Sequence, residues 1–241
     1  MILGGKTYVL TGGASGIGLT TAHHLLDRGA RLIVIDRLEL PEPLAARRPT
    51  FLQADLTDAV KMEALIERVV GDHPRLSGII ASAGLTTIAA FEDTPALAWD
   101  LLIRTNLVAT IRLVHGLLPA LEAEAAACGA ADVVVLGSVA DESYLRGATV
   151  YGTGSAAMKA FASHLRAELS PRGVRAAYIS TGYVRSELAA RLTEGVDDYE
   201  RLEDTLMTPE DYATVIEFVL RQPAGMIVDD ITLVSTAQGW A

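Results

Sequence analysis

The stretch of sequence that decides the fold is Thr11-Gly12-Gly13-Ala14-Ser15-Gly16-Ile17-Gly18. It follows the strand-like run KTYVLTG at residues 6–12 and leads into the helical pattern IGLTTAHHLLDRG at residues 17–29. Glycines between a strand and a helix let the backbone turn tightly and approach a pyrophosphate, which then lies against the amides of the helix N-terminus. The loop therefore predicts a dinucleotide site that includes Gly12, Ser15, Gly16, Ile17 and Gly18.

An acidic residue ends the next predicted strand, RLIVID at residues 31–36. At this place Asp36 can accept hydrogen bonds from both hydroxyls of an adenosine ribose. Its charge also repels a 2′-phosphate, so the sequence favours NAD over NADP, although the neighbouring Arg37 weakens that preference. A merely structural turn beside a surface aspartate is the alternative interpretation, which the strand–loop–helix context disfavours.

Short β-branched runs alternate with longer helical patterns along the whole chain. Such alternation predicts βαβ units and a parallel sheet. We expect an α/β, single-domain Rossmann fold over residues 1–241, with a doubly wound parallel sheet of about seven strands and helices on both faces. Pro119 is expected to break or end the long helical region at residues 94–127. Residues 187–207 lack a strand pattern and are interpreted as a substrate lid within the domain.

The composition excludes several classes of protein. Half of the 241 residues are hydrophobic and only 5% are aromatic, which suits aliphatic strands covered on both faces. A net charge of −10 argues against nucleic acid or an anionic membrane as a partner. The histidines lack metal-ligand spacing, so no metal site is predicted. The strand-like apolar runs are too short to cross a bilayer and no signal-peptide pattern is present, so we expect a cytoplasmic protein.

The spacing Thr-Gly-x-x-x-Gly-x-Gly resembles the short-chain dehydrogenase/reductase superfamily, and the resemblance covers essentially the whole chain. Asp55 and Leu56 match the adenine-contacting position of that family. Ala81-Ser82-Ala83-Gly84 stands where the family usually has Asn-Asn-Ala-Gly, so Ala83 and Gly84 are expected at the cofactor. The residues after the sixth strand that resemble those near the nicotinamide are Thr181, Gly182, Val184 and Ser186, with Thr181-Gly182 replacing the usual Pro-Gly.

The resemblance also implies a catalytic set. Asn106 matches the helix asparagine that holds a proton-relay water, and Ser138 and Tyr151 have the spacing of the family's catalytic serine and tyrosine. In the family the tyrosine exchanges a proton with the substrate oxygen while hydride passes to or from the nicotinamide, and the serine hydrogen-bonds that oxygen. Here Ser155 occupies the position of the family's lysine, which lowers the pKa of the tyrosine.

The absence of that lysine has a large electrostatic consequence. A charge ~4 Å away at an effective dielectric near 20 is worth about 4 kcal/mol, or roughly three pKa units of the phenol. One interpretation is that Lys159, one helical turn further along, reaches back to Tyr151, because helical side chains lean toward the N-terminus. We favour the alternative that Lys159 is a solvated or subunit-interface residue. Ser155 is then left to hydrogen-bond the ribose, with a water bridging to Tyr151.

Three functions are compatible with this pattern. The favoured one is an NAD-dependent oxidoreductase that interconverts a secondary alcohol and a ketone, with Ser138 and Tyr151 at the substrate oxygen. The C-terminal run VDDITLVSTAQ resembles family members that act on small polar alcohols, so we expect a small polar or cyclic substrate. The alternatives are a non-redox lyase, dehydratase or cyclase, and an NAD(H)-binding protein without catalysis. The apolar helices around 96–118 and 155–169 favour a homodimer or homotetramer in each case.

Overall fold

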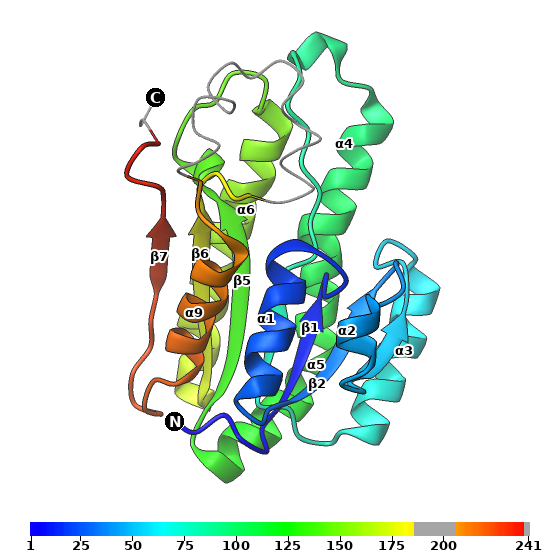
Figure 1. The fold of residues 1–241 in the computed structure, drawn as a ribbon, viewed down its shortest axis with the longest axis vertical. Helices are drawn as coiled ribbons and strands as arrows, with labels where there is room; N and C mark the ends of the chain where they lie inside the picture. Colours follow the sequence, from blue (N-terminus) through cyan, green and yellow to red (C-terminus); the bar gives the residue numbers. More distant parts are fainter. Residues whose placement is uncertain (186–205, 239–241) are drawn as a thin grey trace.

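The computed structural model describes residues 1–185 and 206–238, in which seven parallel strands form one sheet in the order β3-β2-β1-β4-β5-β6-β7 (Figure 1). The strands are β1 (Thr7–Thr11), β2 (Arg31–Asp36), β3 (Thr50–Gln53), β4 (Gly78–Ala81), β5 (Ala131–Ser138), β6 (Val174–Thr181) and β7 (Asp230–Leu233). This architecture confirms the predicted Rossmann fold and its seven-stranded sheet. The order reverses between β1 and β4, so their carboxyl ends form the crevice in which such sheets bind ligands.

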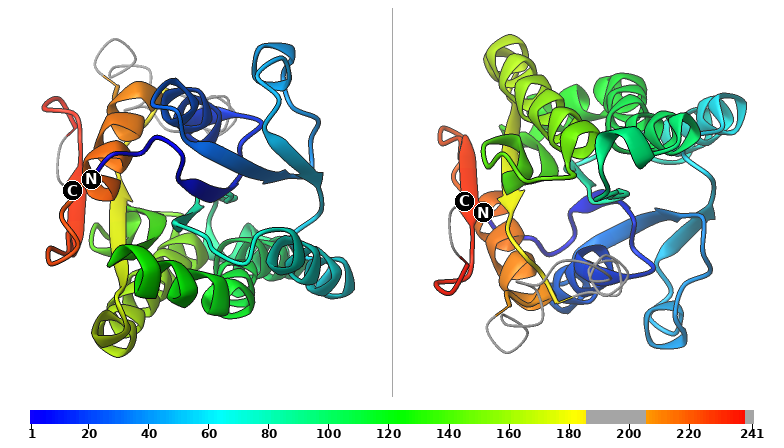
Figure 2. Two further views of the ribbon diagram at one scale, coloured as in Figure 1. Left: turned by 90° about the horizontal axis from the view of Figure 1, so that it is seen from below. Right: turned by 90° about the horizontal axis from the view of Figure 1, so that it is seen from above.

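Helices connect the strands and cover both faces of the sheet. They are α1 (Gly16–Asp27), α2 (Glu42–Ala45), α3 (Ala59–Asp72), α4 (Ala96–Ile103), α5 (Ala109–Cys128), α6 (Thr149–Leu169) and α9 (Pro209–Leu220). Short 3₁₀ turns lie at Phe91–Asp93, Val139–Asp141 and Ser170–Arg172, and a π-helical turn at Arg104–Val108 joins α4 to α5. Seen along the strands, the helices form two layers with the sheet between them (Figure 2).

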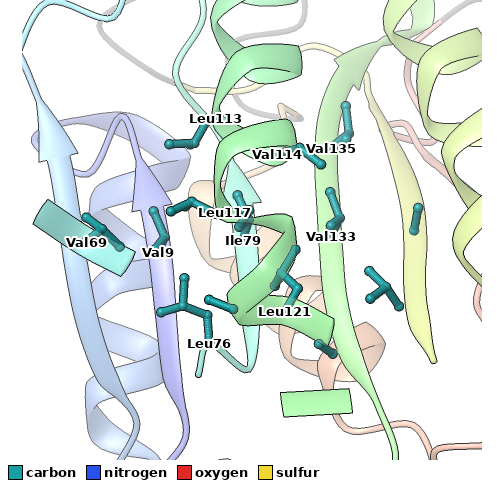
Figure 3. Close-up of a cluster of buried hydrophobic side chains, with 14 of the residues drawn as sticks. Val9, Val69, Leu76, Ile79, Leu113, Val114, Leu117, Leu121, Val133 and Val135 are labelled. Atoms are coloured by element: carbon teal, nitrogen blue, oxygen red, sulfur yellow. The ribbon is translucent and has the colours of Figure 1, made fainter. Parts of the chain in front are cut away.

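Alternate residues of each strand point to opposite faces, which divides the core into two clusters. Val9, Ile79 and Val133 contribute to the face covered by α3, α5 and α6. Leu113, Leu117 and Leu121 of α5 pack onto this face of the central strands (Figure 3). The second cluster, which contains Tyr8, Leu10 and Val34 of the strands, lies beneath α1 and α9. Burial on both faces explains why the strands read as nearly continuous aliphatic runs.

Three sequence-based expectations about helices need correction. Pro119 lies inside α5 and does not end it. It is exposed, and its loss of one backbone donor is tolerated because the flanking turns bury Leu117 and Leu121 against the sheet. Helix α6 begins at Thr149, earlier than the pattern from Ser155 onward indicated. Helix α9 was not predicted, although Thr208 begins it with a capping box.

The run Ala96–Cys128, which comprises α4, the π turn and α5, is long and apolar enough by length and composition to cross a membrane. It is much longer than the strand-like apolar runs, which are too short to cross a bilayer. In the structure α5 packs on the sheet and buries Leu113, Val114 and Leu117 there (Figure 3). These contacts are those of a core helix.

Candidate active site

The glycine loop between β1 and α1 has a backbone that only glycine can follow. Gly12 has a φ of +73°, and a Cβ on it would lie 2.8 Å from the Ala83 Cα. A Cβ on Gly18 would lie 2.0 Å from the Gly12 carbonyl oxygen. The loop therefore packs directly against the ends of β4 and α1. Ala83, which the family resemblance places at the cofactor, lies against this loop.

Helix α1 begins at this loop, and its N-cap side chain does not cap the backbone amides of its first turn. Ser15 is the N-cap residue, is exposed, and makes no side-chain capping hydrogen bond with the described residues. Gly16 adopts a φ of +53°, and the Ile17 side chain after it packs against the second core cluster. Uncapped first-turn amides and the helix dipole together favour an anionic group at this point.

Asp36 links the end of β2 to the glycine loop. Its Oδ2 accepts a hydrogen bond of 2.9 Å from the Ala14 amide, and its Oδ1 accepts one of 2.9 Å from the Leu38 amide. Both oxygens are thus oriented by backbone donors, while the side chain stays partly exposed. This arrangement holds the carboxylate beside the loop, where the sequence placed a ribose contact.

The carboxyl ends of β3 and β4 complete this side of the crevice. Asp55 Oδ1 accepts hydrogen bonds from the Thr57 amide and hydroxyl, which lower the pKa of the Asp55 carboxyl. Leu56 next to it packs against the core beneath α3 and α5. On the neighbouring strand, the Ala83 amide donates a 3.1 Å hydrogen bond to the Thr11 hydroxyl. Gly84 is exposed at the same edge.

Asn106 lies in the π-helical turn, and both polar atoms of its side chain hydrogen-bond with the backbone of the segment after β4. Its Oδ1 accepts a 2.7 Å hydrogen bond from the Leu85 amide, and its Nδ2 donates one of 2.8 Å to the Leu85 carbonyl. The Asn106 carbonyl accepts a 2.8 Å hydrogen bond from the Thr110 hydroxyl. Single π turns of this kind occur frequently at functional sites.

Tyr151 lies in the first turn of α6, and its phenol meets three hydroxyl side chains. The side chains of Ser138, Thr86 and Ser155 lie beside it. Burial raises the pKa of the Tyr151 phenol above its usual value near 10; these three hydroxyl side chains oppose the rise and the Asp141 carboxyl adds to it. The structure thus brings together the predicted catalytic hydroxyls and adds Thr86, which sequence reasoning missed.

Lys159 is held away from Tyr151 by acidic residues. Its ammonium lies 2.8 Å from Asp230 Oδ2 and 3.9 Å from Asp141 Oδ2, and it also pairs with Glu142. Burial opposes its charge, but the hydrogen bonds with Asp230 and Glu142 outweigh that effect and raise the pKa of Lys159. The ammonium is therefore neither a direct partner of the Tyr151 phenol nor simply solvated.

The loop after β6 closes the crevice on its other side. The Gly182 amide donates to the Leu233 carbonyl at 2.8 Å and to the Tyr212 hydroxyl at 3.1 Å. Thr181 Oγ1 donates a 2.8 Å hydrogen bond to the Gly137 carbonyl. Val184 is buried and bridges to Met207. Ser186 and residues 187–205 of the predicted lid lie outside the described residues.

Comparison with known proteins gives a consistent result. The family model described as short chain dehydrogenase matches residues 6–197. Sulfoacetaldehyde reductase 2 of Chromohalobacter salexigens is 28% identical over 97% of this chain and 95% of its own length. A second Chromohalobacter salexigens protein, named sulfoacetaldehyde reductase, is also 28% identical, over 96% of this chain and 94% of its own.

Solved structures share the fold. The RhlG/NADP active-site complex of Pseudomonas aeruginosa has a TM-score of 0.87 and 25% identity, over 98% of this chain and 97% of that one. The 3-ketoacyl-(acyl-carrier-protein) reductase of Brucella melitensis, complexed with NADH, has a TM-score of 0.87, 16% identity, and coverage of 98% and 99%. With the fold, the glycine loop and the matching family model in place, this chain belongs to the short-chain dehydrogenase family and is an oxidoreductase.

Proposed function

We propose that this protein is an NAD-dependent oxidoreductase that interconverts a secondary alcohol and a ketone on a small polar or cyclic substrate. One observation carries the proposal: Ser138 at the end of β5 and Tyr151 in the first turn of α6 lie beside each other, at the edge of the sheet that also bears the glycine loop. Two neighbouring hydroxyls suit a substrate oxygen, because one can donate a hydrogen bond to it and the other can exchange a proton with it.

The residues around the glycine loop fit a dinucleotide. A Cβ on Gly16 would point into open space, and Gly16 together with the uncapped first turn of α1 suits a pyrophosphate. Asp36 supports NAD over NADP, because a carboxylate there accepts from ribose hydroxyls and repels a 2′-phosphate. Asp55 and Ala83 would border the adenine and the nicotinamide side of the crevice. When bound, the cofactor supplies or accepts the hydride.

Tyr151 and Ser138 would divide the work at the substrate oxygen. Ser138 Oγ donates a hydrogen bond that stabilises the negative charge developing there, while Tyr151 Oη transfers its proton to that oxygen during carbonyl reduction. Asp141 contributes a negative charge to the surroundings of Tyr151, and Lys159 is bound to carboxylates. These surroundings favour the protonated phenol, so we expect the site to work as a proton donor and carbonyl reduction to predominate near neutral pH.

The comparisons support a small polar carbonyl substrate. Two relatives are named sulfoacetaldehyde reductases, and sulfoacetaldehyde is a short aldehyde with a charged group. An aldehyde of this kind would present the same carbonyl oxygen to Ser138 and Tyr151 as a ketone. We therefore include short polar aldehydes beside ketones in the proposed substrate class. The proposed location is the cytoplasm, which the packing of the apolar helix α5 on the sheet supports.

The test follows NADH consumption with a panel of small ketones, keto acids and polar aldehydes. Turnover that Tyr151→Phe lowers by at least ~100-fold supports the proposal, because general acid–base groups contribute about 10²–10⁴-fold. Unchanged turnover in Tyr151→Phe would overturn it. Should turnover appear only in Ser155→Lys, the native protein would instead be a non-redox enzyme or an NAD(H)-binding protein whose scaffold retains a latent reductase site.

A further inference from the structure

A second buried tyrosine, Tyr178 of β6, contacts two of the residues that build the candidate site. It is 1% exposed, and its phenol oxygen accepts a 3.3 Å hydrogen bond from the Ser138 amide. The same hydroxyl donates a 3.3 Å hydrogen bond to the Ser155 carbonyl. One oxygen atom thus links the end of β5 to the first turns of α6. Ser138 and Tyr151 are carried by these two elements.

Strand β5 makes room for this phenol. A Cβ placed on Gly137 would lie 1.9 Å from the Tyr178 oxygen and 2.2 Å from its Cζ, so any other residue at 137 would expel the ring. Gly137 has no positive φ in the structure, so its small size and not its backbone freedom is what the position requires. Gly137 and Tyr178 therefore form a complementary pair, in which a side chain from β6 fills the space left empty on β5.

Charged groups fix the other side of the phenol. The Asp141 side chain is 2% exposed, and its charge adds to burial in raising the pKa of the Tyr178 phenol, which keeps the hydrogen that Tyr178 donates to the Ser155 carbonyl. The Lys159 ammonium lies 3.9 Å from Asp141 Oδ2 and 5.8 Å from the centre of the Tyr178 ring. Asp230 of β7 holds that ammonium in turn at 2.8 Å.

We propose that Tyr178 is a positioning residue for the Ser138–Tyr151 pair, and that Asp141 and Lys159 keep its phenol oxygen in place. The phenol sets how far the Ser138 end of β5 lies from the turn of α6 that carries Tyr151. The inference rests on the proposed function, because the two positioned hydroxyls are those assigned there to the substrate oxygen. A shift of about 1 Å between such groups can lower turnover roughly 100-fold.

The test is the variant Tyr178→Phe, which keeps the ring and removes the oxygen. We expect the Ser138 amide to exchange its hydrogen about 3- to 10-fold faster, as loss of one hydrogen bond predicts. We also expect kcat to fall roughly 10- to 100-fold, with the KM of the carbonyl substrate and the Kd of NADH within about twofold of the wild type. Tyr8→Phe is the matched control.

Tyr8 suits that control because it is equally buried, lies on the opposite face of the sheet and is the second residue of β1, away from the carboxyl ends of the strands. Its hydroxyl has no hydrogen-bond partner among the described residues. We expect Tyr8→Phe to change neither Ser138 exchange nor kcat. A general loss of stability from altering a buried tyrosine would instead appear in both variants.

Two results would overturn the inference: unchanged Ser138 exchange in Tyr178→Phe, or faster exchange with unchanged kcat. The exchange measurement needs no substrate, so it is independent of the proposed function, which fails if Tyr151→Phe retains full turnover. If Tyr178→Phe does not fold, Asp141→Ala tests the same contact from its other side. It should raise Ser138 exchange by a smaller factor, and unchanged exchange there would equally count against the proposal.

Discussion

Asp36 joins two functions in one side chain. One oxygen holds the glycine loop through the Ala14 amide and the other holds the chain beyond β2 through the Leu38 amide. A carboxylate oxygen has more than one lone pair, so the same oxygens remain able to accept from a ribose. The loop and the proposed recognition of NAD therefore depend on one residue, and cofactor preference is the property that tests it.

Asp36→Asn is expected to weaken NADH binding roughly 10- to 100-fold, because a hydrogen bond to a charged group is worth about 1.5–3 kcal/mol. NADPH binding should weaken less or improve, since the repulsion of the 2′-phosphate is removed. Fluorescence titration with both cofactors measures the ratio of the two dissociation constants. Glu39→Gln, which removes an exposed charge nearby, is the control and should leave the ratio unchanged. An unchanged ratio in Asp36→Asn would show that this residue does not select the cofactor.

Tyr151 has a phenol pKa that burial raises, with Asp141 adding to the rise, and this determines the expected pH dependence. The phenol stays protonated below that pKa, so carbonyl reduction should be nearly independent of pH between about pH 6 and 9. Alcohol oxidation needs the phenolate, so its rate should rise about tenfold per pH unit over the same range. Rate profiles in both directions check this. An oxidation rate that levels off near neutral pH would contradict it.

Ser155→Lys should reverse much of this behaviour. A cation beside the phenol lowers its pKa by about 1–3 units. Because the phenolate fraction below the pKa rises with each unit, oxidation at a fixed neutral pH should increase roughly 10- to 1000-fold. Reduction should begin to decline at a lower pH than in the wild type. Ser155→Ala, which adds no charge, is the control: it removes a hydroxyl that opposes the rise in the pKa of Tyr151, so oxidation should not accelerate. A matching acceleration in Ser155→Ala would exclude the electrostatic explanation.

At the scale of helices and strands, α9 carries part of the candidate site although it is remote in sequence. Thr208 caps it: its hydroxyl accepts from the Asp211 amide, and the Asp211 carboxylate accepts from the Thr208 amide. Tyr212 in the first turn then accepts from the Gly182 amide. The start of α9 therefore sets the position of the loop after β6.

Thr208→Ala is expected to lower the free energy of unfolding by about 1 kcal/mol, since loss of an N-cap costs about 0.5–2 kcal/mol. For a chain of this size the melting temperature should fall roughly 2–4 °C. Thr153→Ala is the control, because Thr153 is an exposed threonine inside α6 where alanine is the better helix former. Thermal unfolding of both variants measures the difference. Equal melting temperatures would mean that the capping box does not stabilise α9.

The sequence predicted features that depend on neighbours along the chain. The loop from Gly12 to Gly18, the strand that ends at Asp36 and the spacing of Ser138 and Tyr151 are all local patterns. The sequence could not predict the ion pairs of Lys159, because its partner Asp230 lies on β7, far away along the chain. Nor did it reveal Tyr178, because a tyrosine in a buried strand has the same pattern whether its hydroxyl is functional or not. The signal for α9 was present at residues 208–211 but was not recognised beside the presumed lid.

At the scale of the whole molecule, one helical surface remains apolar. Leu97, Leu101, Val108 and Ile111 follow each other at helical spacing along α4, the π turn and α5, and their exposed fractions run from 84% to 36%. Contiguous exposed apolar side chains of this kind mark interaction surfaces. A second copy of the chain is the expected partner, since two-fold dimers are the commonest soluble oligomers.

We therefore expect the protein to be a homodimer or a larger homo-oligomer at micromolar concentration. The double variant Leu101→Asp/Ile111→Asp should dissociate it, because burying two carboxylates in an apolar contact costs several kcal/mol. Light scattering coupled to size exclusion gives the mass of each form. Val60→Asp, which alters an exposed apolar residue on α3, is the control and should keep the wild-type mass. If the double variant also keeps that mass, self-association must use another surface, and if the wild type is a monomer, the apolar surface does not bind a second copy.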